Sequence, residues 1–368
     1  MKLSFSKNSL LNGINIVSKA VPAKTTMPIL ECILIDASGE TIKLTANDME
    51  LGIETVVEGN ILKRGNIAIE AKLFSEIIRR LPDSQVVIES DEQNNVAITC
   101  EKAAFKIAGK SGDEFSYLPV IERDSHILVS QFTLKEIIRQ TIFSIAAGEV
   151  NKLMTGELFE VCENELKVTS LDGHRIAIRK VTLKESYHAQ KVVVPGKTLI
   201  EISKILSGDT DKEVTIFFGS NHILFEFDNT IVVSRLLEGE YFKVQKMLSG
   251  DYETKMTVSK RDFLDSIERA VLLHREGDKK PIILDLKDQV LQMTLTSMIG
   301  TMKEDILVDK TGKDIMIGFN PKFLIDALRV IDDETVDIYM VNSKAPCFIR
   351  DEQESYIYLI LPVNFNRA

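Results

Sequence analysis

The chain has 368 residues, of which 44% are hydrophobic and 27% charged, and its net charge at pH 7 is -10. This length exceeds what one ordinary hydrophobic core needs and predicts two or three domains. The acidic charge excludes a protein that grips nucleic acid over its whole surface, and a chain with no tryptophan and 7% aromatic residues is a poor base-stacking platform. DNA binding would therefore need a local basic face or a topological link.

Cysteine usage and the apolar runs indicate the compartment. The four cysteines, Cys32, Cys100, Cys162 and Cys347, are far apart and form no CxxC pair, so we expect them to be reduced and structural. No uncharged apolar run of membrane-spanning length is present, and residues 1–5 do not resemble the apolar core of a signal peptide. We expect a cytoplasmic protein without membrane attachment.

The first third of the chain alternates short strands with two helices. A strand at residues 3–6 precedes an apolar-striped segment at 10–21 that predicts a helix, and a second such helix is predicted at 71–81. The predicted strands between and after these helices are 29–35, 42–45, 86–89 and 96–100.

The same order of elements returns twice. In the middle third we predict helices at 134–146 and 196–206, and in the last third at 263–273 and 321–331. The accompanying strands are predicted at 128–130, 158–161, 166–169, 176–178, 214–218 and 223–227, and then at 256–259, 282–286, 291–295, 336–341, 347–350 and 356–362.

The three second helices match position by position. Lys72, Lys197 and Lys322 are each 125 residues apart. At the same offset the apolar positions coincide, namely Phe74, Leu199 and Leu324, then Ile77, Ile202 and Ala327, then Leu81, Leu206 and Ile331. A unit of roughly 120 residues therefore occurs three times.

The first helices repeat in the same way. Serines precede all three of them, and Ser6, Ser130 and Ser259 are predicted to act as N-caps. Polarity rises between units near 122–125 and 249–253, which predicts three domains at residues 1–124, 125–252 and 253–368. The sequence favours an α+β fold in which each unit has two sheets and two helices.

The repeated second helices present basic residues in register. Each has two cations seven residues apart, and these pairs are Lys72 with Arg79, Lys197 with Lys204, and Lys322 with Arg329. If the units stand side by side, the pairs form a basic lining suited to phosphates. Glu76, Glu201 and Asp326 lie one turn after the lysines, however, so a solvated face of i, i+4 salt bridges explains the pattern equally well.

The densest polar motif is Asp172-Gly173-His174-Arg175. One hypothesis is a hydrolase in which Asp172 orients His174 as a general base. No Gly-x-Ser-x-Gly elbow, cysteine nucleophile or second histidine at metal spacing accompanies the motif, and no glycine-rich phosphate loop occurs. A polar turn between two strands or the wall of a binding pocket is the stronger interpretation, and we expect no catalytic residue, metal or cofactor.

With three units established, the whole chain resembles the bacterial sliding clamp family, the beta subunits of replicative DNA polymerase III. The resemblance is seen in these segments: residues 1–5, 10–11, 26–30, 155–156, 172–175, 318–320 and 358–362. It implies three tandem DNA-clamp domains, and two chains that pair head to tail into a closed ring around duplex DNA. It also implies a non-catalytic processivity factor that holds a polymerase on DNA.

The family resemblance implies three sets of site residues. DNA-contacting residues of the lining would be Lys24, Lys72, Arg79, Lys197, Lys204, Lys322 and Arg329. A hydrophobic peptide-binding groove would comprise Met154, Thr155, Leu171, Gly173, His174, Arg175, Ile176, Phe242, Met247, Pro346, Leu359, Leu361 and Pro362. The dimer interface would include Phe105, Ile107, Val271 and Leu272. Phe242 stands where the family often has proline, and Asn151-Lys152 stand where an arginine is common.

The resemblance further implies the partners: a second copy of the chain, double-stranded DNA bound without sequence preference, the DNA polymerase III catalytic subunit, the clamp loader, and other replication and repair proteins with a clamp-binding motif. Two rival hypotheses remain, an enzyme that uses Asp172 and His174, and a repeat scaffold that binds only proteins. Residues 364–368 extend past the usual family end, and we expect them to form a disordered tail.

Overall fold

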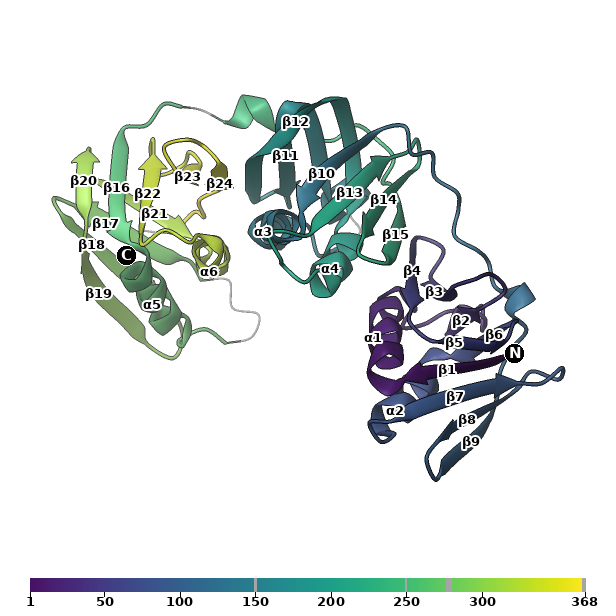
Figure 1. Cartoon of the computed structure of the whole chain (residues 1–368). Coiled ribbons are helices and arrows are strands. Elements are labelled where there is room, and N and C mark those ends of the chain that lie inside the picture. The colour runs from purple at the N-terminus through teal and green to yellow at the C-terminus, as the bar shows by residue number, and fades with distance from the viewer. Residues whose placement is uncertain (149–150, 249, 276–279, 366–368) are drawn as a thin grey trace. The chain divides into compact units, whose positions relative to one another are not determined.

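The computed structural model describes residues 1–148, 151–248, 250–275 and 280–365 (Figure 1). The chain forms two compact units. Unit 1 comprises Met1–Lys135 and Lys197–Leu236, and unit 2 comprises Glu136–Gly196 and Leu237–Ala368. The middle predicted repeat thus contributes to both units.

Unit 1 contains two antiparallel sheets. The first has the order β5 (Asn60–Lys63), β1 (Lys2–Ser6), β7 (Gln85–Ser90), β8 (Asn95–Cys100) and β9 (Ala103–Ala108). The second has the order β10 (His126–Ser130), β13 (Glu213–Phe218), β14 (His222–Phe227), β15 (Thr230–Arg235), β4 (Leu51–Val57), β3 (Ile42–Asn47), β2 (Cys32–Asp36) and β6 (Asn66–Glu70).

Unit 2 also contains two antiparallel sheets. The third sheet has the order β11 (Gly156–Leu171), β12 (Arg175–Pro195), β24 (Tyr356–Ile360), β23 (Cys347–Arg350), β22 (Thr335–Met340), β16 (Thr254–Ser259) and β20 (Asp309–Gly312). The fourth has the order β19 (Thr301–Leu307), β18 (Val290–Thr296), β17 (Ile282–Lys287) and β21 (Ile315–Phe319).

The second and third sheets each join strands from two successive repeats. In the second sheet β15 pairs with β4, so that Val232 lies opposite Ile53. In the third sheet β12 pairs with β24, so that Ile178 lies opposite Ile357. Repeats are therefore fused through continuous backbone hydrogen bonding, which explains why the compact units do not coincide with the sequence repeats.

The six helices lie where the repeat predicts them. They are α1 (Lys7–Val17), α2 (Ala71–Arg80), α3 (Gln131–Thr141), α4 (Gly196–Ile205), α5 (Lys260–Val271) and α6 (Pro321–Val330). The predicted serine caps are confirmed, because the hydroxyls of Ser6, Ser130 and Ser259 accept the backbone N–H three residues later at 3.1, 3.0 and 3.3 Å.

The repeated apolar positions form the cores. All nine residues predicted to coincide on the second helices are buried. In unit 1, α1 packs against β3, β4 and α2, and in unit 2, α5 packs against β18, β19 and α6. Each of these large buried side chains contributes on the order of 2 kcal/mol to folding by leaving water, so the repeat pattern is the pattern of the core.

Element ends differ from the prediction where turns intervene. The predicted helix at 10–21 ends at Val17, and only a short 3-10 turn (Ser18–Ala20) follows. Val21 is extended because Pro22 disfavours a helical residue before it. The predicted strand at 29–35 begins only at Cys32, since the Leu30 and Cys32 N–H groups donate to Met27 and Ile29 in turns.

A second helix also ends earlier than predicted. The first helix predicted for the middle repeat, 134–146, ends at Thr141, and a 3-10 turn (Ile142–Ser144) follows. All four cysteines are free thiols; Cys162 is exposed and the others are buried. Residue 249 of the predicted boundary at 249–253 and residues 366–368 of the predicted tail lie outside the described residues. Within the described ranges, no helix is both long and apolar enough to span a membrane.

Candidate functional site

The Asp172–Arg175 motif forms a tight turn between β11 and β12. Asp172 Oδ1 accepts the backbone N–H groups of His174 and Arg175 at 2.9 and 3.2 Å, and Gly173 has a positive φ of 89°. An aspartate that folds back on its own turn is the usual Asx arrangement. The Asp172 carboxylate thus serves the backbone and Arg175, which argues against its use as the orienting group of a catalytic His174.

Arg175 is the buried centre of this region, with 7% of its side chain exposed. Its Nε donates to Asp172 at 3.0 Å, Nη1 to Asp326 at 2.7 Å and Nη2 to the Phe143 carbonyl at 2.5 Å. The guanidinium also stacks over the Phe323 ring at 4.5 Å. Its distance to the Phe143 ring is 5.4 Å. Two carboxylates and two aromatic rings therefore stabilise the buried charge, and the bond to Asp326 holds the turn against α6.

Beside this turn, unit 2 forms a distinct apolar cluster. Five of the predicted groove residues belong to it: Met154, Leu171, Ile176, Leu359 and Leu361. Strand register explains this, because Ile176 on β12 lies directly opposite Leu359 on β24. The structure brings these five together on one surface of the third sheet.

The other predicted groove residues are not part of this cluster. Phe242 and Met247 are exposed, and the Phe242 ring contacts the Tyr241 ring edge-on at 5.7 Å. The exposed His174 imidazole stacks on Phe323 at 6.1 Å. Gly173 is exposed and Thr155, Pro346 and Pro362 are half-buried. Exposed aromatic and thioether side chains around an apolar floor can anchor an apolar peptide segment.

Several residues of this region were not predicted. Tyr241 and Val244 are buried in the cluster, and Phe143 and Phe323 sandwich the Arg175 guanidinium. The aromatic residues come from segments distant in sequence, so no local spacing indicates them. The alignment of the three second helices did draw attention to Asp326. It was interpreted there as a negative charge beside the basic lining, not as a partner of Arg175.

Glu157 is an unusual group beside the cluster. It lies on β11 next to Gly156, whose carbonyl accepts the Tyr241 hydroxyl at 3.3 Å. Its carboxylate is fully buried, and neither oxygen has a hydrogen-bond partner among the described residues. Burial without a compensating cation disfavours the charged form and raises the pKa of Glu157 to about 8.

The predicted basic residues are exposed, but their pairing differs between copies. The expected i, i+4 ion pair forms in the third copy, between Lys322 and Asp326 at 2.7 Å. In the second copy Lys197 instead pairs with Asp48, and Lys204 pairs with Glu201 at 2.8 Å.

In the first copy the expected pair is absent, since Lys72 has no ion pair with any described residue. Arg329 pairs with Glu268 at 2.8 Å, and Arg79 donates to the Ser75 hydroxyl at 3.4 Å. Lys24 is exposed after the first 3-10 turn. The alternative of a uniform i, i+4 salt-bridge ladder therefore holds in the third copy only: in the second copy both lysines have other carboxylate partners, and in the first copy Lys72 has none among the described residues.

Two of the predicted dimer residues lie on an edge strand and the other two at the end of a helix. Phe105 and Ile107 are on β9, an edge strand of the first sheet, and Phe105 is exposed. Leu272, 78% exposed, caps the C-terminus of α5 in unit 2, directly after Val271. In the same unit β19 is an edge strand of the fourth sheet.

Comparison with known proteins covers the whole chain. The DNA polymerase III beta subunit models match residues 1–119 for the N-terminal domain, 128–243 for the central domain and 245–364 for the C-terminal domain. The beta sliding clamps of Staphylococcus epidermidis and Staphylococcus aureus are each 35% identical over 374 residues, which cover 99% of both chains.

Solved structures agree in fold. A putative DNA polymerase III beta subunit from Eubacterium rectale is 64% identical, with a TM-score of 0.97 over 99% of this chain and 100% of that one. The DNA polymerase sliding clamp from Bacillus subtilis is 34% identical, with a TM-score of 0.96 and full coverage of both chains.

Proposed function

Because the chain belongs to the family of DNA polymerase III beta subunits, the beta sliding clamps, we propose that it encircles duplex DNA as a head-to-tail dimer and tethers the replicative polymerase. The observation that carries this proposal is the match of all three repeats to the three successive domains of that family. We keep the domain limits 1–124, 125–252 and 253–368 as part of the proposal, together with a cytoplasmic location.

Ring closure requires complementary surfaces at the two ends of the chain. Unit 1 has an open edge at β9 and unit 2 has one at β19. An exposed edge strand presents unpaired backbone N–H and C=O groups that a second chain can complete. The exposed Phe105 and Leu272 would add apolar contact. A dimer that joins β9 of one chain to β19 of its partner would therefore bury the open strand edges and these two side chains.

The basic residues of the second helices would contact DNA inside the ring. Lys24, Lys72, Arg79, Lys197, Lys204, Lys322 and Arg329 are the proposed lining. Most of these cations already have acidic partners, which lowers the gain from any single phosphate contact. Weak, exchangeable contacts suit a ring held by topology, and they explain how an acidic protein can operate on DNA.

The apolar cluster of unit 2 is the proposed peptide-binding groove. Its floor is formed by Leu171, Ile176, Leu359 and Leu361, and its rim by His174, Phe242 and Met247. We propose that the polymerase catalytic subunit, the clamp loader and repair proteins each bind this groove through a short apolar motif, one partner at a time. The groove carries no chemistry of its own, and the chain's role is non-catalytic.

A primer-extension assay on a singly primed circular template tests this function. With the DNA polymerase III catalytic subunit and the clamp loader, addition of the chain is expected to lengthen the products of a single binding event. A variant with Leu171 and Leu361 changed to aspartate is expected to lose this effect. Products of equal length with and without the wild-type chain would contradict the proposal.

A further inference from the structure

The segment after β24 runs from the proposed groove to the fourth sheet. The Leu361 N–H donates to the His174 carbonyl at 2.9 Å, and the Val363 N–H donates to the Gly318 carbonyl at 2.8 Å. Pro362 between them has no N–H to donate. Two hydrogen bonds thus connect this segment to the Asp172–Arg175 turn on one side and to β21 on the other.

Phe365 adds a side-chain contact at the second connection. A methyl group on Gly318 would lie 2.7 Å from Phe365 Cδ1 and 3.0 Å from the Val363 carbonyl oxygen. The ring therefore rests against bare backbone of β21, a contact that only glycine permits. Phe365, within the predicted tail, thus lies against the sheet.

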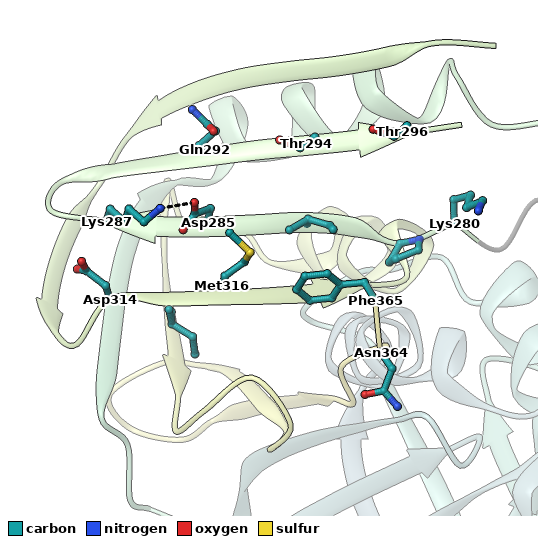
Figure 2. A pocket seen from close by; sticks show the side chains of 13 residues that line it. Lys280, Asp285, Lys287, Gln292, Thr294, Thr296, Asp314, Met316, Asn364 and Phe365 are labelled. Atoms are coloured by element: carbon teal, nitrogen blue, oxygen red, sulfur yellow. Dashed lines mark hydrogen bonds and ion pairs between the residues drawn. The ribbon is translucent and has the colours of Figure 1, made fainter. Parts of the chain in front are cut away.

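The ring sits in a hollow of the fourth sheet. Figure 2 shows Phe365 lying along β21, with Met316 further along the strand, whereas Asn364 points away from the sheet. Pro281, Ile283 and Met316 line this hollow, which has a volume of about 920 Å³. Phe365 lines the hollow together with these apolar side chains, and the exposed Asn364 lines it as well.

We infer that Phe365 is a positioning residue for the peptide-binding groove: its ring clips the chain end to Gly318 and so holds Leu361 and Pro362 in the groove wall. This inference rests on the proposed function. Without the ring, Leu361 would keep its backbone hydrogen bond and its packing against the cluster, but Val363 would be held to β21 by one backbone hydrogen bond, which opens more readily without a side-chain contact beside it. A frayed wall must be reordered by each incoming peptide, and that cost lowers affinity.

The test compares Phe365→Ala with Phe365→Tyr, which keeps the ring, and with Asn364→Ala, the exposed neighbour. Fluorescence polarisation measures binding of a labelled short peptide with leucine and phenylalanine anchors, and of the DNA polymerase III catalytic subunit. Hydrogen exchange measures protection of the Leu361 and Val363 amides. Gly318→Ala, whose added methyl group would meet the ring and the Val363 carbonyl oxygen, disturbs the same contact from the β21 side.

Phe365→Ala and Gly318→Ala are expected to weaken peptide binding by about fivefold or more and to speed amide exchange at Val363, with little change in Tm. Phe365→Tyr and Asn364→Ala should match wild type. If Val363 exchange rises while peptide affinity stays within twofold, or if exchange does not change, the positioning role is wrong although the groove stands. If the wild-type chain binds neither probe, the proposed groove itself is wrong.

Discussion

Arg175 shows how one residue determines the geometry of a site that contains mostly apolar side chains. Its three donating nitrogens contact three different acceptors, two of which come from segments remote in sequence. The motif around it was identifiable from sequence, because Asp and Gly before a strand signal a turn. The role of the arginine was not, since Phe143 and Asp326 approach it only in the folded chain.

Replacing Arg175 with methionine is expected to lower the free energy of unfolding by about 3 to 5 kcal/mol, because Asp172 and Asp326 would lose a buried partner and the Phe143 carbonyl its donor. Peptide binding should weaken as well, since the Asp172–Arg175 turn would form one wall of the proposed groove. Chemical denaturation and fluorescence polarisation measure the two effects.

A matched control is Arg261→Met, since Arg261 is 88% exposed and its nearest carboxylate is 3.8 Å away. It is expected to change stability by less than about 0.5 kcal/mol. Equal stability of the Arg175 and Arg261 variants would show that the buried ion pairs contribute nothing measurable.

Glu157 gives a pH-dependent prediction with a definite sign. The pKa of Glu157 is about 8 in the folded chain against an ordinary value of 4.5. Between these values the folded chain keeps a proton that the unfolded chain releases, so this residue makes stability fall as pH rises from about 4.5 to about 8. Glutamine remains neutral throughout and avoids that loss.

The variant Glu157→Gln is therefore expected to match wild type near pH 4.5 and to be more stable by roughly 4 to 5 kcal/mol at pH 8.5. Thermal unfolding across this pH range is the measurement. Glu163→Gln, an exposed carboxylate on the same strand, should show no such trend. A constant difference between wild type and Glu157→Gln at every pH would contradict the assigned protonation state.

At the scale of elements, the repeat predicted the helices, part of the strands and the apolar faces of the second helices, whereas strands such as β9 and β19 were not predicted. The 3.6-residue and two-residue periods are local signals, and they survive in all three copies. Element ends were less accurate where a proline or a turn hydrogen bond ended a segment early, as at Pro22 and Cys32. Pairing of strands between repeats has no local signal, so the fused sheets were not predictable.

The open sheet edges give the first prediction at this scale. Phe105→Asp and Leu272→Asp would each place a charge beside a proposed subunit contact, and we expect the dimer dissociation constant to rise at least tenfold for each. Leu62→Asp is the control, because Leu62 is also exposed but lies on β5, the opposite edge of the first sheet. Analytical ultracentrifugation reports the change. A dimer weakened equally by Leu62→Asp would place the interface elsewhere.

The second prediction at this scale concerns the lysines of the second helices. Changing Lys72, Lys197 and Lys322 together to glutamine should weaken binding to linear duplex DNA and reduce the slope of log affinity against log salt by up to about 3. Lys72 alone should contribute the most, because the other two lysines already have acidic partners. Exchanging Lys212, Lys287 and Lys313, which are outside the proposed lining, is the control. An unchanged salt slope in the first variant removes these lysines from DNA binding.

For the whole molecule, similarity over the full length established the family, whereas composition alone only limited the ways in which DNA could be bound. A net charge of -10 is unfavourable for an open DNA-binding surface and acceptable for a ring that is held by enclosure. The proposed closed dimer would be a property of two chains, and so its residues were inferred from the family resemblance and not from hydrophobic periodicity in one chain.

Retention on circular DNA tests enclosure most directly. The chain is labelled, loaded onto a nicked circular plasmid with the clamp loader and ATP, and separated from free protein by gel filtration in high salt. We expect the label to remain with the intact circle and to be released once a restriction enzyme linearises the DNA. Equal retention on circular and linear DNA, or loss from both, would contradict a ring that holds DNA by topology.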